Sequence, residues 1–177
     1  MENEFRELVL GATPRLKKKR YDRGGDEAYK NPTYIDMFES QDVVVWDLNV
    51  HPLPFEDNTF DEIHAYEVLE HLGKQGDWKF FFEEFAEYWR ILKPNGYMFI
   101  SVPRWDRIFA YGDPGHTRVL PHFVFNYLDP VYYEDNQKEG TTSTDYLSVL
   151  KCNFKIVGSR AEAVSEFTKL KAIKNVG

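Results

Sequence analysis

Short, continuously apolar runs recur along the chain, and most of them end at a glycine, an acid or a proline. Uninterrupted apolar runs of four to six residues are typical of strands buried on both faces of a parallel sheet. The pattern therefore predicts parallel strands at about 7–10, 33–36, 43–46, 61–65 and 97–102. Two later runs, 154–159 and 167–173, predict antiparallel neighbours that complete one edge of the same sheet.

One segment has the period of an amphipathic helix. From Asp77 to Leu92, large apolar residues recur three or four positions apart, at Trp78, Phe81, Phe82, Phe85, Trp89 and Leu92. This spacing places them on one helical face, and Asp77 is a suitable N-cap. The turn at 93–96, Lys-Pro-Asn-Gly, ends the helix and leads into the strand at 97–102. A shorter helix is expected from Glu67 to Gly73.

Two segments show no regular period. Residues 13–32 are polar and predict a long loop, whereas residues 105–136 are rich in aromatics and proline and predict a structured insertion or lid. The order of elements favours an α/β fold with a largely parallel sheet and helices on its faces. We expect one domain over residues 1–177, because 177 residues with 42% hydrophobic content suffice for one core.

The charge balance narrows the classes of partner. A formal net charge of −7 disfavours broad nucleic-acid binding. The basic cluster from Arg15 to Arg20 is either a solvated loop or an anion contact. A single cysteine, Cys152, excludes an intrachain disulfide, and no apolar run has the length of a signal-peptide core or a membrane span. We expect a soluble, cytoplasmic protein.

Residues suited to binding a nucleoside stand where the expected strands end. Ligands of open α/β sheets bind at the carboxyl ends of the strands. Gly11 follows the first strand, Asp36 ends the second, Asp47 and Leu48 follow the third, and the fourth continues into Tyr66 and Glu67. Glycine gives the backbone room, and carboxylates can bind ribose hydroxyls and an adenine amino group. Helix capping or a solvated loop position remains the alternative for each acid.

Three linked motifs carry a resemblance to a known family. Asp47-Leu48 is followed by LPFEDNTFDEI at 53–63, then by EVLEHL at 67–72 and by RILKPNGYM at 90–98. Together they resemble the middle of small class I S-adenosylmethionine (SAM)-dependent methyltransferases of the type-11 kind, over residues 42–103. The resemblance implies a Rossmann-like fold, with a mostly parallel central sheet, helices on both faces and an antiparallel closing strand.

The resemblance also implies a cofactor site for SAM and transfer of a methyl group to an oxygen or nitrogen of an acceptor that the sequence does not identify. The implied contacts are Gly11 with the methionine end, Asp36 with the ribose, Asp47 and the Leu48 backbone with adenine, and Tyr66 and Glu67 with the region of the sulfonium.

The first loop departs from the family pattern, and this leaves other hypotheses open. Where the family has G-x-G, this chain has Gly11-Ala12-Thr13-Pro14. The side chain of Thr13 and the ring of Pro14 narrow the approach to a ligand. A second hypothesis is therefore a catalytically degenerate protein that acts as a binding or assembly module. A third is a domain for another adenine nucleotide, which we rank last because the loop lacks G-x-G-x-x-G.

Two further groups are candidates for chemistry. Glu67, Glu70 and His71 form E-x-x-E-H, which resembles a metal-binding set of some SAM-dependent 2′-O- and catechol-like O-methyltransferases. We favour a supporting role at the helix–strand junction instead, and expect no metal. His116 is the candidate catalytic residue, as a general base, although a lone loop histidine is often only exposed. We expect His116 and Arg118 to face the methyl-donor end of the site.

Overall fold

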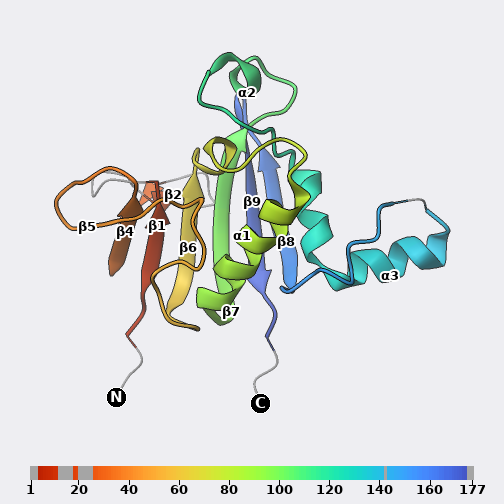
Figure 1. Ribbon diagram of the computed structural model, residues 1–177, viewed down its shortest axis with the longest axis horizontal. Coiled ribbons are helices and arrows are strands. Elements are labelled where there is room, and N and C mark those ends of the chain that lie inside the picture. The colour runs from red at the N-terminus through yellow and green to blue at the C-terminus, as the bar shows by residue number, and fades with distance from the viewer. Residues whose placement is uncertain (1–3, 12–17, 20–25, 142, 175–177) are drawn as a thin grey trace.

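A computed structural model describes residues 4–11, 18–19, 26–141 and 143–174 of the chain. Its centre is a seven-stranded sheet in the order β5-β4-β1-β6-β7-β9-β8 (Figure 1). The strands are β1 (Glu7–Leu10), β4 (Pro32–Asp36), β5 (Val43–Val45), β6 (Phe60–Tyr66), β7 (Leu92–Pro103), β8 (Phe154–Ala161) and β9 (Ser165–Ala172).

The strand directions confirm the sequence prediction. β1 pairs in parallel with β4 and β6, β4 with β5, and β6 with β7. β9 runs antiparallel to both β7 and β8. Strand β1 is buried on both of its faces, since Leu8, Val9 and Leu10 are each at most 1% exposed. The result is the expected mostly parallel sheet with an antiparallel closing pair.

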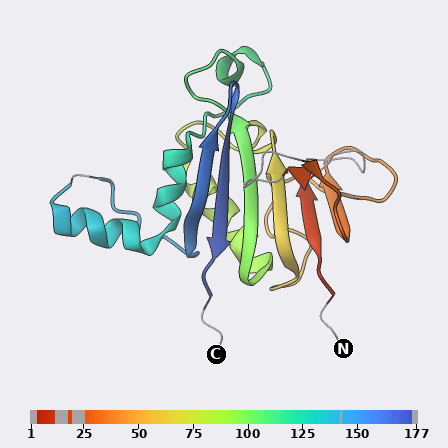
Figure 2. The same ribbon diagram turned by 180° about the vertical axis from the view of Figure 1, so that it is seen from behind.

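Helix α1 (Trp78–Ile91) forms as its pattern predicts. The Asp77 side chain accepts a hydrogen bond from the Phe80 amide at 3.1 Å, so it caps the first turn. The apolar face of α1 packs on the sheet and buries Phe81, Phe82, Phe85, Tyr88 and Ile91. Seen from behind (Figure 2), the sheet has no described helix lying over this face. The Tyr29 ring packs edge-on against Tyr34 and His64. The short helix expected at 67–73 is reduced to the 3₁₀ turn η1 (Leu69–His71).

The segment 105–136, which the sequence predicts as a structured insertion or lid, contains helices that its pattern did not locate. It holds α2 (Phe109–Gly112), η2 (His122–Leu128) and most of α3 (Pro130–Glu139). These helices lack an apolar period, and α3 is instead defined by its caps. Asp129 accepts from the Val131 amide at 2.9 Å, and Gly140 ends the helix with φ +68°.

The expected loop at 13–32 contains a short antiparallel ladder, β2 (Lys18–Lys19) with β3 (Asp26–Glu27). Residues 12–14 and the rest of the basic cluster lie outside the described residues. In the part of the chain that the structure describes, no helix has the length and apolar character that crossing a membrane requires.

Candidate functional site

The carboxyl ends of β1, β4, β5 and β6 meet at one edge of the sheet, at the top of Figure 1. The register sets Leu10 beside both Ile35 and Ala65, so the residues that follow these strands are neighbours. The parallel pairing therefore brings Gly11, Asp36, Asp47 and Glu67 to a common edge, as the sequence predicts.

Gly11 occupies a position that excludes a side chain. Its φ is +57°, and a Cβ there would lie 2.4 Å from Val68 Cγ2. The Gly11 amide donates to the Ile35 carbonyl at 2.9 Å, which fixes the turn at the end of β1. The backbone is thus held close to the loop after β6, and no Cβ stands above it.

Asp36 and Asp47 are held at the strand ends by local hydrogen bonds. Asp36 Oδ1 accepts from the Phe38 amide at 2.9 Å, and the Asp36 carbonyl accepts from the Trp46 amide at 2.9 Å. Asp47 Oδ1 accepts from the amide and the Nδ2 group of Asn49, both at 2.9 Å. These turns keep one carboxylate at the end of β4 and another just after β5.

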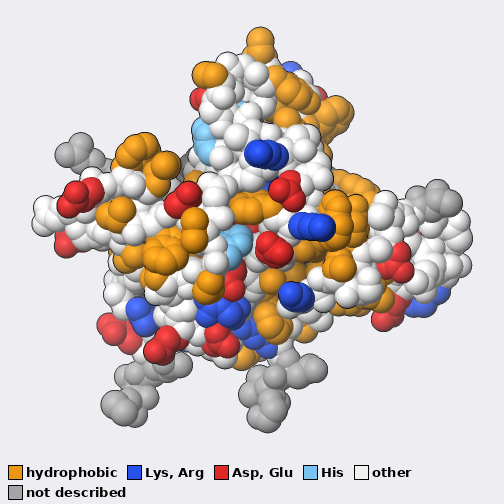
Figure 3. All heavy atoms as spheres, in the orientation of Figure 1, with side chains coloured by type: hydrophobic (Ala, Val, Ile, Leu, Met, Phe, Trp, Pro, Cys, Tyr) orange, Lys and Arg blue, Asp and Glu red, His pale blue; other side chains and the backbone are white. Residues whose placement is uncertain are grey.

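Four apolar residues near these acids were missed by the sequence analysis. Met37, Phe38, Val45 and Val50 are between 50% and 72% exposed. Apolar side chains lie on the surface over the β4–β5 end of the sheet (Figure 3). Exposed apolar side chains beside two carboxylates suit a flat, partly polar ligand such as a nucleoside. By contrast, the Leu48 side chain is buried in the core, which leaves only its backbone for a ligand.

Glu67 follows β6 in a left-handed backbone conformation, with φ +52°. Its amide donates to the Ser101 carbonyl at 2.9 Å, which anchors the turn to β7. Glu67 lines an open cleft of about 600 Å³ together with Pro103, Ile108, Phe109, Gly112, Asp113, Pro114, His116, Val164 and Ser165. Tyr66 is not among the residues that line this cleft. Its hydroxyl lies 3.0 Å from Nδ1 of His64, which belongs to the same strand, β6.

His116 lies in this cleft beside a second acid. Its Nε2 is 4.0 Å from Glu70 Oε1 and 4.0 Å from Asp113 Oδ2, and its ring packs edge-on against His71 at 4.7 Å. Burial raises the pKa of Glu70 to about 8, and the charge of Glu67 acts in the same direction. The structure therefore brings His116 to the cleft, beside a carboxyl group whose pKa burial raises into the neutral pH range.

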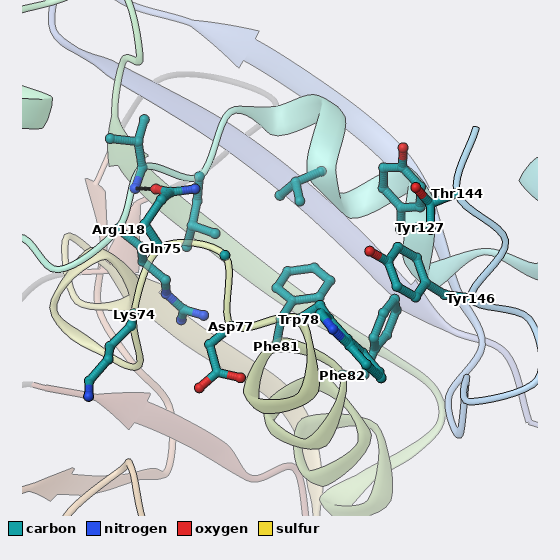
Figure 4. A pocket seen from close by; sticks show the side chains of 14 residues that line it. Lys74, Gln75, Asp77, Trp78, Phe81, Phe82, Arg118, Tyr127, Thr144 and Tyr146 are labelled. Atoms are coloured by element: carbon teal, nitrogen blue, oxygen red, sulfur yellow. Dashed lines mark hydrogen bonds between the residues drawn. The ribbon is translucent and has the colours of Figure 1, made fainter. Parts of the chain in front are cut away.

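The prediction that Arg118 faces this cleft was wrong. Arg118 Nη2 donates to both oxygens of Glu84 in α1, at 2.9 and 2.7 Å, and its Nε donates to the Leu69 carbonyl at 2.9 Å. The guanidinium is buried by these bonds and forms part of the wall of a separate pocket of about 270 Å³. In that pocket Trp78, Phe81 and Phe82 of α1 lie opposite Tyr127 and Tyr146 (Figure 4).

Comparison with known proteins agrees with this geometry. Residues 28–100 match the family model of a methyltransferase domain. The chain has the fold of class I, SAM-dependent methyltransferases. The match begins before β4 and ends within β7, so it includes Asp36, Asp47 and Glu67. SAM, the cofactor implied by the sequence resemblance, is the methyl donor of this fold class.

Solved structures share the fold at low sequence identity. A SAM-dependent methyltransferase from Archaeoglobus fulgidus is 15% identical, with 94% of this chain and 86% of that chain covered and a TM-score of 0.52. The putative methyltransferase in a complex with the Haloferax volcanii Trm112 activator is 12% identical, with 96% of this chain and 83% of that chain covered and a TM-score of 0.56. A Burkholderia thailandensis 1,6-didemethyltoxoflavin N1-methyltransferase with S-adenosylhomocysteine bound is 14% identical, with 96% of this chain and 71% of that chain covered and a TM-score of 0.53. No curated protein matches the chain.

Proposed function

We propose that this protein transfers a methyl group from SAM to an oxygen or nitrogen nucleophile of an acceptor bound in the cleft at Glu67. The observation that carries the proposal is the meeting of Gly11, Asp36, Asp47 and Glu67 at the carboxyl ends of four parallel strands. A glycine that tolerates no Cβ, two anchored carboxylates and nearby exposed apolar side chains fit a nucleoside with an amino-acid tail.

Each residue has a role that its position allows. The Asp36 carboxylate would accept hydrogen bonds from the ribose hydroxyls, and Asp47 would accept from the adenine amino group. The backbone at Gly11 would hold the methionine portion, and Glu67 would bind its ammonium group. When bound, SAM supplies an electrophilic methyl group on its sulfonium.

The cleft indicates the character of the acceptor. Ile108 and Phe109 are exposed apolar residues in its wall, whereas Glu67, Asp113 and His116 supply polar groups. This lining suits an acceptor with an apolar body and one nucleophilic hydroxyl or amine. His116 stands where it can take the proton of that nucleophile, and holding the reactants in line supplies the rest of the rate enhancement.

Calorimetry with SAM and S-adenosylhomocysteine tests the cofactor site directly. We expect saturable binding of both ligands at one site, and weaker binding of both by the isosteric variant Glu67→Gln. A screen of acceptors with methyl-labelled SAM then tests the transfer itself. Absence of binding to either ligand would contradict the proposal and favour a non-catalytic binding or assembly module.

A further inference from the structure

Three side chains in the wall of the cleft converge on one point. Glu70, His71 and His116 each offer one ligand atom, and these atoms all lie within 4.8 Å of one another. Glu70 and His71 come from η1, whereas His116 comes from the segment after α2, which the fold lays across η1. The Thr117 amide donates to the Glu70 carbonyl at 2.9 Å and holds the two segments together.

The Glu70 carboxylate is buried without a partner. Glu70 is 2% exposed, and within the described part of the chain neither of its oxygens, nor His116 Nδ1, has a hydrogen-bond partner. Burying a polar group without a hydrogen bond costs several kcal/mol, so such groups are rare in folded proteins. The 4.0 Å between Glu70 Oε1 and His116 Nε2 is too long for a hydrogen bond.

The orientation of His71 is set by a backbone carbonyl. His71 Nδ1 lies 3.1 Å from the Gly115 oxygen, to which it can donate a proton. That hydrogen bond leaves the lone pair on Nε2, the arrangement found in histidines that bind metals. A Cβ on Gly115 would lie 3.2 Å from His71 Nδ1, so the absence of a side chain at residue 115 gives the imidazole its space.

We propose that Glu70, His71 and His116 bind a divalent first-row transition metal, such as Zn²⁺, Co²⁺ or Mn²⁺, in the wall of the cleft. Two imidazoles and one carboxylate suit these ions better than Mg²⁺, which prefers oxygen ligands. Ligands about 2.1 Å from a metal stand roughly 3 to 3.5 Å apart, so shifts of about 1 Å close the site. This assignment replaces the sequence expectation that no metal binds.

The metal gives the cleft a second function, which rests on the proposed methyl transfer. With three protein ligands, the ion keeps positions open for an oxygen or nitrogen of the acceptor. It would orient that atom beside Glu67 and make its proton more acidic, so that the proton could pass to water in the open cleft. His116 would then be a metal ligand in place of the general base proposed above, and the acceptor class narrows to molecules that carry a metal-binding hydroxyl, carbonyl or amine.

Titration of the chelator-treated protein with Co²⁺ tests the site without an activity assay. Visible absorption and calorimetry report whether one equivalent binds and with what Kd. We expect saturable binding by the wild type, and at least about tenfold weaker binding by Glu70→Gln, His71→Gln and His116→Gln. His122→Gln is the matched control, because His122 lies on the same segment, is half exposed and stands outside the cluster. It should bind Co²⁺ like the wild type.

Two results would overturn the metal site. One is no saturable binding of Co²⁺, Zn²⁺ or Mn²⁺ by the wild type, and the other is a Co²⁺ affinity of all three cluster variants equal to that of the wild type. His71 is exposed, so its variant tests the site even where a buried substitution prevents folding. S-adenosylhomocysteine affinity, measured on the metal-free protein, separates the two proposals. If the metal-free wild type does not bind S-adenosylhomocysteine, the proposed methyl transfer is contradicted. The metal site is decided by the Co²⁺ titration alone.

Discussion

At the scale of single residues, Arg118 and Glu84 form an ion pair inside the protein. Arg118 is 5% exposed and Glu84 is fully buried, and the Tyr88 hydroxyl also donates to Glu84 at 3.1 Å. Arg118→Met leaves the carboxylate buried without its cation, so we expect a loss of about 3–5 kcal/mol in the free energy of unfolding. Urea unfolding monitored by circular dichroism measures the loss.

The double variant Arg118→Met/Glu84→Gln is the control for this pair. Removing both charges abolishes the unpaired carboxylate, so the double variant should regain a large part of the lost stability. A double variant no more stable than Arg118→Met would show that the damage comes from lost packing, such as the contact of the guanidinium with the Phe80 ring.

Lys174 predicts a dependence of stability on pH. Burial lowers the pKa of Lys174 to about 8 from its usual 10.5, against the opposing effect of Asp57. Between about pH 8 and 10.5 the unfolded chain therefore holds more protons at this position than the folded chain, so this residue makes stability rise with pH across that window. Below pH 8 both states are protonated and the contribution is constant.

Comparison with Lys174→Met isolates this effect from other titrating groups. The Lys174 ammonium donates to Asn58 Oδ1 at 2.7 Å and to the Arg90 and Leu92 carbonyls, so the variant also loses a constant amount of stability. Urea unfolding at pH 7, 9 and 10.5 should show the wild type gaining on the variant as pH rises. A difference that stays constant with pH would contradict the lowered pKa.

At the scale of elements, the sequence predicts those whose signal is local and periodic. The range of β1 agrees with its prediction, and α1 was predicted to within a residue at each end because Asp77 caps it and its apolar face repeats. The helix α3 has caps but no apolar face, so a search for periodicity overlooks it. Asp129 before Pro130, with Gly140 after the helix, was the available signal.

The candidate site divides in the same way. Gly11, Asp36, Asp47 and Glu67 were predictable because strand ends of a parallel sheet share an edge. The position of Arg118 was not, because its partner Glu84 lies 34 residues away on a helix face, and the pairing depends on how segment 105–136 folds over α1. The convergence of His116 with Glu70 has the same origin, since 46 positions separate the two residues.

The segment 105–136 is also the element whose mobility we predict. Its α2 portion stands beyond the end of β7 (Figure 1). Trp105, Ile108, Phe109 and Tyr111 are each more than half exposed. Elements with few buried contacts open readily, so amides of α2 should exchange with deuterium faster than those of β7. We expect this exchange to slow when S-adenosylhomocysteine is added.

The amides of η2 serve as the internal control for this experiment. Phe125 and Leu128 are fully buried, so η2 should exchange slowly with or without the ligand. If α2 exchanges as slowly as β7 in both conditions, it is a static insertion and not a lid over the site.

At the scale of the whole molecule, the sheet couples ligand binding to stability. Asp36 ends β4, and its carbonyl accepts a hydrogen bond from the Trp46 amide just after β5. A ligand held by the Asp36 side chain would therefore be linked to both β4 and β5. A ligand that binds only the folded state stabilises it by about 2.7 kcal/mol at 100 times its Kd. We therefore expect S-adenosylhomocysteine to raise the thermal unfolding midpoint in proportion to the logarithm of its concentration.

Asp36→Ala should reduce this ligand-induced shift. Loss of the hydrogen bonds to the ribose weakens binding by about 1–3 kcal/mol, which is roughly a 5- to 150-fold rise in Kd. Asp135→Ala is the matched control, because Asp135 is an exposed aspartate on α3 that pairs only with Lys138 among the described residues, at 3.3 Å. Differential scanning fluorimetry at several ligand concentrations gives both shifts. An undiminished shift in Asp36→Ala would mean that another group holds the ribose, and the carboxylate of Asp47 would be the next to replace.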